Sequence, residues 1–70
     1  MKVYIDTHEV IIFEGATVAD AVLSYSKVSY KKVIGGKLLV IDCFGNPTEA
    51  DGLLTDGQVL KLRRKPVNKL

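Results

Sequence analysis

Residues 17 to 20 form a helix start signal that limits how the first third of the chain can fold. Thr17-Val18-Ala19-Asp20 has the Ser/Thr-x-x-acid pattern in which the hydroxyl accepts one backbone N–H and the acid reaches back to another. Apolar residues at helical spacing follow and share one face, namely Val18, Ala21, Val22 and Tyr25. We expect a helix from residue 17 that packs this face on a sheet.

Two strands are expected before this helix. Residues 2–6 alternate polar and apolar side chains, and residues 9–14 are a β-branched and aromatic run. The turn formers between them, with Gly15 after the second run, predict a hairpin.

The second half of the chain contains signals for at least two more strands. Residues 29–32 are polar and are expected to lead away from the helix, with Val33-Ile34 as a short piece of a third strand broken by Gly35-Gly36. Residues 37–41 include four consecutive apolar residues and predict a buried strand. Residues 58–63 alternate again after the Asp56-Gly57 turn and predict the last strand.

A chain of 70 residues with 47% hydrophobic residues is long enough for one small core and too short for a second domain. The predicted class is α+β in the order ββαββ, with one helix packed on a mixed sheet of four to five strands. Residues 1–63 form the expected domain and residues 64–70 a basic tail. The single Cys43 excludes an internal disulfide and is expected to be half-buried near a strand end.

The net charge of +2 conceals an uneven distribution along the chain. Residues 1–60 carry five Lys and eight Asp or Glu, whereas the last ten residues carry five cations and no acid. A solvated tail and a contact with phosphate or an acidic protein are both open interpretations. No leader and no run of eighteen apolar residues is seen, so we expect a soluble cytoplasmic protein without membrane contact.

The order of elements and the Leu-x-Asp-Gly start of the last strand resemble the β-grasp, or ubiquitin-like, superfamily. Residues 14–20 and 54–60 are most similar to the sulfur carriers of thiamine and molybdopterin synthesis (ThiS and MoaD types), and the resemblance covers residues 2–63. The same signals occur in TGS domains and in ferredoxin-like domains.

Each of these relatives implies a chemistry that the residues can be checked against. Sulfur carriers end in Gly-Gly, whereas this chain ends in Pro66-Val67-Asn68-Lys69-Leu70, and its Gly35-Gly36 lies inside the chain. A degenerate or processed carrier is therefore the third-ranked hypothesis. Ferredoxin-like domains need several cysteines after the helix, and residues 26–36 contain none, so no cluster or other cofactor is expected.

No catalytic constellation is recognisable. The acids are scattered over turns and strand ends, and His8 between Asp6 and Glu9 is interpreted as a turn histidine in water and not as a metal ligand. We expect neither an enzyme nor a metal site.

The first functional hypothesis is a non-catalytic β-grasp module that binds a protein partner through Arg63, Arg64 and Lys65, with Lys31 and Lys32 as secondary contacts. The alternative is a TGS-like RNA-binding module using Tyr30, Lys31, Lys32 and Arg64, in which stacking accompanies phosphate contact. Exposed sheet edges make either a monomer or a weak homodimer compatible with the sequence.

Overall fold

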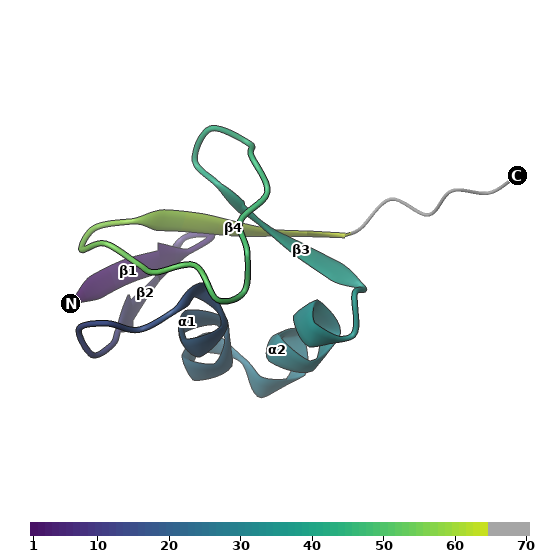
Figure 1. Ribbon diagram of the computed structural model, residues 1–70, viewed down its shortest axis with the longest axis horizontal. Coiled ribbons are helices and arrows are strands. Elements are labelled where there is room, and N and C mark those ends of the chain that lie inside the picture. The colour runs from purple at the N-terminus through teal and green to yellow at the C-terminus, as the bar shows by residue number, and fades with distance from the viewer. Residues whose placement is uncertain (65–70) are drawn as a thin grey trace, which may run out of the picture.

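A four-stranded mixed sheet and two short helices make up the computed structural model, which describes residues 1–64 (Figure 1). The elements in chain order are β1 (Lys2–Ile5), β2 (His8–Ile11), α1 (Val18–Tyr25), α2 (Lys27–Ile34), β3 (Leu38–Asp42) and β4 (Val59–Arg64). The predicted α+β class and a mixed sheet of four strands are confirmed, whereas the prediction of a single helix is wrong.

The hairpin of β1 and β2 is tighter than expected. The strands pair antiparallel from Lys2 opposite Ile11 to Ile5 opposite His8, which leaves Asp6 and Thr7 as the turn. Asp6 has a φ of 54°, in the left-handed region that aspartate tolerates better than most side chains. β2 was expected to reach residue 14 but ends at Ile11, because the N–H of Ala16 turns back to the carbonyl of Phe13 at 3.3 Å.

The predicted start of α1 is confirmed in both halves of the capping box. The Thr17 hydroxyl accepts the N–H of Asp20 at 3.3 Å, and the Asp20 carboxylate accepts the N–H of Thr17 at 3.0 Å. The next N–H groups, of Val18 and Ala19, donate to carbonyls of residues 52 and 50 at 2.9 and 2.8 Å. The loop before β4 therefore closes over the start of α1.

Residues 27–34 form α2, so the expectation of a polar link followed by a piece of strand is wrong. Ser26 allows the second helix to begin at once: its N–H closes α1 on Val22 at 2.8 Å, while its hydroxyl accepts the N–H of Ser29 at 3.2 Å. Tyr30 and Val33, three residues apart, then pack against the core. Burial of this face overrides the low helix propensity of the β-branched residues in α2.

Gly35-Gly36 ends α2 and turns the chain into β3. Gly36 has a φ of 78°, its N–H donates to Val33 at 3.1 Å, and the N–H of Lys37 donates to Lys32 at 2.8 Å. These two hydrogen bonds define a Schellman motif, whose left-handed position strongly favours glycine. The double glycine thus has a structural role at this helix end.

The sheet has the order β2-β1-β4-β3, in which β1 is parallel to β4 and the outer pairs are antiparallel. The Asp56-Gly57 turn attaches the start of β4 to the start of β1. The Asp56 carboxylate accepts the N–H of Lys2 at 2.7 Å, and Gly57 donates to the Lys2 carbonyl at 2.6 Å. The first and last strands of the described chain therefore lie at the centre of the sheet.

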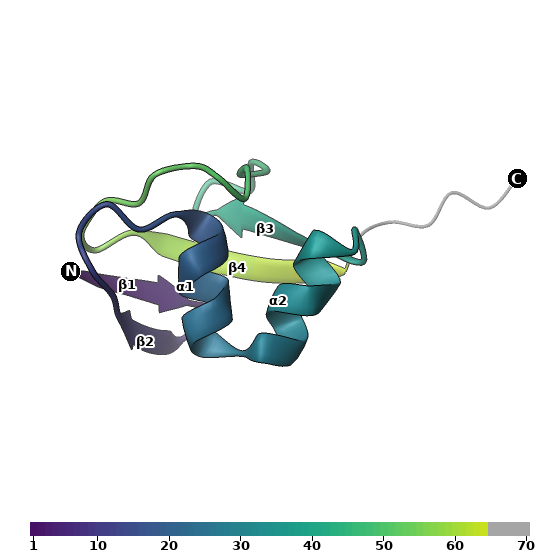
Figure 2. The same cartoon turned by 60° about the horizontal axis from the view of Figure 1, so that its bottom comes forward.

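Both helices lie on the same face of the sheet (Figures 1 and 2). The core forms between this face and the helices, and its largest fully buried side chains are those of Val3, Ile5, Val22 and Leu60. On β4 the alternation follows the prediction, since Leu60 is buried and its neighbour Lys61 is only half-buried.

Replacing Leu60 tests this core. Because Leu60 is fully buried between β1 and β3, Leu60→Ala should lower the free energy of unfolding by about 3 kcal/mol. Lys61→Ala is the matched control on the other face and should change it by no more than about 0.5 kcal/mol. Urea unfolding followed by circular dichroism measures both, and equal losses would contradict the assigned orientation of β4.

Candidate interaction surface

Five exposed cationic residues lie at the end of the molecule where α2 ends, β3 begins and β4 finishes. Two backbone links bring them together: the N–H of Lys37 donates to Lys32 at 2.8 Å, and the next residue, Leu38, pairs with Arg64 across the sheet. Figures 1 and 2 both show the last turn of α2 beside the end of β4. We call this surface the basic end; its members, all exposed, are Lys31, Lys32, Lys37, Arg63 and Arg64.

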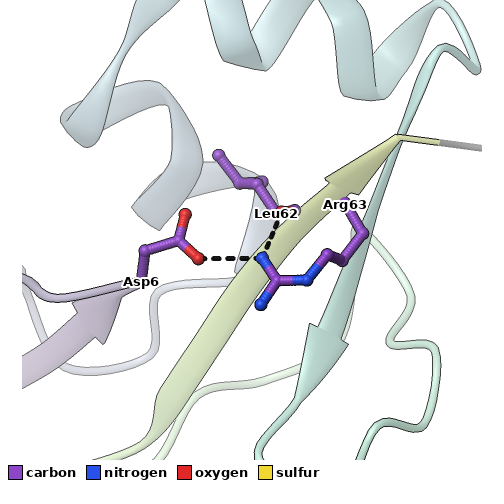
Figure 3. A network of polar contacts seen from close by, with 3 residues as sticks. All are labelled: Asp6, Leu62 and Arg63. Atoms are coloured by element: carbon purple, nitrogen blue, oxygen red, sulfur yellow. Dashed lines mark hydrogen bonds and ion pairs between the residues drawn. The ribbon is translucent and has the colours of Figure 1, made fainter.

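An acid reaches the basic end from the β1–β2 turn. Nη1 of Arg63 lies 3.1 Å from Oδ1 of Asp6 and 2.7 Å from the carbonyl oxygen of Leu62 (Figure 3). The Arg63 and Asp6 side chains are 51% and 35% exposed, so water screens this pair strongly. Arg63 is oriented by the contact, and the other four cations extend the positive surface towards α2.

Exposed acids lie towards the opposite end of the sheet. Glu14 precedes α1, Glu49 and Asp51 lie in the loop that closes over the start of α1, and Asp56 stands before β4. Because β4 runs from these loops to the basic end (Figure 1), these four acids lie towards the opposite end of the strand direction from the five cations, whereas Asp6 lies at the basic end. The basic end therefore has a local positive field that the small net charge conceals.

The structure places four of the cations that the sequence predicts together as partner contacts at one end of the molecule. Arg63 and Arg64 are the last residues of β4, and Lys31 and Lys32 lie in the last turn of α2, where cations also interact favourably with the helix dipole. Lys65 lies outside the described residues. Sequence reasoning missed Lys37, which follows the Gly-Gly helix end directly; recognising that end as a helix terminus would have identified it.

Tyr30 belongs to the core more than to the surface. Its side chain is half-buried and packs against the core residues under α2. A ring in that position offers little free face for a nucleotide base, so the constellation of Tyr30 with Lys31, Lys32 and Arg64 lacks its stacking element.

Cys43 is exposed, so the expectation of a half-buried thiol is wrong. The physical reason is the turn after β3, in which the Asp42 carboxylate accepts the N–H groups of Phe44 and Asn46, each at 2.9 Å. These bonds fold residues 43–46 outward, away from the core. Phe44 is 84% exposed on the same turn.

The hairpin offers other titratable groups. His8 is exposed and its ring lies 5.3 Å from that of Tyr25. Nζ of Lys2 lies 2.9 Å from Glu9, and this hydrogen bond raises the pKa of Lys2 because the carboxylate favours the charged ammonium. Within residues 1–64, no group of three or more His, Cys, Asp or Glu side chains is placed to hold a metal ion.

No family model matches the chain, and searches of curated proteins and of solved structures return no match. Among the described residues, neither helix is long and apolar enough to cross a membrane. Function therefore has to be inferred from the surface itself.

Asp6→Asn tests whether the Asp6–Arg63 pair is structural. Asparagine tolerates the left-handed backbone at this position, and exposed ion pairs contribute little, so the free energy of unfolding should change by no more than about 0.5 kcal/mol. Urea unfolding of the variant and of the unchanged protein measures the difference. A loss of about 2 kcal/mol or more would show that Arg63 is held for stability and is unavailable to a partner.

Proposed function

We propose that this protein is a non-catalytic β-grasp module that binds an acidic surface of a protein partner through its basic end. The β-grasp assignment is supported by a hairpin covered by a helix, a final strand parallel to the first, and the sheet order β2-β1-β4-β3. The likeness to ThiS-type and MoaD-type domains lies in these elements and in the Leu-x-Asp-Gly start of β4.

The convergence of exposed cations from α2 and β4 is the observation that carries the proposal. Four of the five backbones belong to α2 or to the end of β4 that pairs with β3, so the anchor points of these side chains are set by the fold. Exposed charges of predominantly one sign steer an oppositely charged partner and set its orientation. Such a surface needs no catalytic group.

A protein partner fits this surface better than RNA does. Single-strand RNA binding combines a basic groove with exposed aromatic rings, and Tyr30 is half-buried in the core. The net charge of +2 is also low for a dedicated nucleic-acid binder. A TGS-like RNA-binding role is therefore the alternative outcome of the test.

Two further features bear on pathway and location. Cleavage after Gly35-Gly36 would release β3 and β4 from the sheet, which argues against a processed sulfur carrier. An exposed, unpaired Cys43 is suited to the reducing cytoplasm, which we propose as the location.

Charge reversal at the basic end tests the proposal. Lys31→Glu combined with Arg64→Glu should weaken partner binding by about tenfold or more, because two steering cations become repulsive. The matched control is Lys27→Glu with Lys61→Glu, which changes the net charge equally at positions outside the basic end. The measurement is crosslinking capture from a lysate of the source organism, with and without nuclease, followed by titration of the purified partner.

The expected result is a partner retained by the unchanged protein and by the control but lost by the basic-end variant, in both nuclease conditions. Equal capture by all three proteins would contradict the electrostatic mechanism. Retention that disappears with nuclease would favour the RNA-binding alternative.

A further inference from the structure

The outer strands of the sheet are β3 and β2, and within residues 1–64 other parts of the chain cover part of β3 but not β2. On β3, the carbonyl of Val40 accepts the N–H and the hydroxyl of Thr48 at 2.8 and 2.9 Å, and the N–H of Asp42 donates to Asn46 at 2.9 Å. The chain's own residues 46–48 thus cover the Val40–Asp42 part of this edge. Such covering is a common way to prevent a sheet edge from pairing with another chain.

On β2 the outer edge is open within the described residues. Met1 and Ile12 exchange hydrogen bonds across the hairpin. By antiparallel alternation along the register, Val10 and His8 also face β1, while Glu9 and Ile11 point their N–H and C=O groups away from it. Among residues 1–64, no hydrogen bond occupies these outward groups. No proline or lysine lies on β2 to block an incoming strand.

Apart from His8, the side chains along this edge are apolar or already charge-compensated. Ile11 is 67% exposed and Phe13, just beyond β2, is 63% exposed. Oε1 of Glu9 lies 2.9 Å from Nζ of Lys2, and Oδ1 of Asp6 in the adjoining turn lies 3.1 Å from Nη1 of Arg63. Two such edges can therefore approach each other without two uncompensated carboxylates meeting.

We propose that β2 pairs antiparallel with β2 of a second copy of this chain, about a two-fold axis at Val10, joining the two sheets into one. This register sets Glu9 of each copy opposite Ile11 of the other, so all the outward groups of both residues are paired and no like charges are opposite.

The alternative axis at Ile11 is less favourable. It would set Glu9 opposite Phe13, whose carbonyl already accepts the N–H of Ala16 at 3.3 Å. The axis at Val10 leaves that turn unchanged and uses groups that are free in the described part of the chain. The basic end lies on the other side of the sheet, at β3, β4 and α2, and remains exposed in this dimer.

Sedimentation equilibrium on the full chain tests the proposal. Over roughly 10 µM to 1 mM, the range suited to an interface this small, the unchanged protein should show a reversible monomer–dimer equilibrium. Ile11→Lys places a charge on the edge and should raise the dimer dissociation constant by about tenfold or more. Phe44→Lys is the matched control, since it replaces an exposed apolar residue away from β2 and should leave dimerisation unchanged.

Amide hydrogen exchange of the unchanged protein provides a readout that needs no variant. Exchange at Glu9 and Ile11 should slow as protein concentration rises, while the other exposed amides do not respond. A monomer at every concentration, or a dimer that survives Ile11→Lys with exchange at Glu9 and Ile11 unchanged, would overturn the proposal. If the protein is monomeric, a strand of a different protein is the remaining candidate for pairing with β2.

Discussion

The parallel pairing of β1 with β4 is the interaction on which the rest of this structure depends. It joins the N-terminal hairpin to the last strand of the described chain, through hydrogen bonds from Tyr4 to Gln58 and from Asp6 to Leu60 at 2.9 and 2.7 Å. It also sets Ile5 beside Leu60, both fully buried beneath the helices. Within residues 1–64, β3 joins the sheet only through β4, so the position of the basic end follows from the same pairing.

Local sequence signals correctly predicted the elements whose local preference agrees with their contacts in the folded protein. The capping box at Thr17 and the alternation in β4 are such cases, because the same side chains that signal the element also satisfy its caps or its core. α2 is the opposite case. Its Val33-Ile34 pair favours a strand locally. The helix forms because Ser26 caps it and because its apolar face packs against core residues that are distant in the sequence.

The arrangement of the candidate site residues likewise depends on contacts that local sequence signals do not contain. Lys31, Lys32, Arg63 and Arg64 were identifiable as cations, but their proximity depends on α2 ending beside β4, and that follows from the helix the sequence did not reveal. Exposed sheet edges were expected from the sequence, but not that residues 46–48 cover part of β3 and leave β2 as the more open edge of the described sheet. Two surfaces result on opposite sides of one sheet, with an acidic protein partner proposed for one and a second copy for the other.

Native-state hydrogen exchange at Tyr4 and Asp6 tests most directly whether the β1–β4 pairing governs the fold. If it does, both amides exchange only through global unfolding, and their opening free energy equals the free energy of unfolding measured in urea. Opening of these two amides at a clearly lower free energy, while the hairpin and α1 stay protected, would contradict the account. The last strand, and the basic end with it, would then be a separately mobile part of the protein.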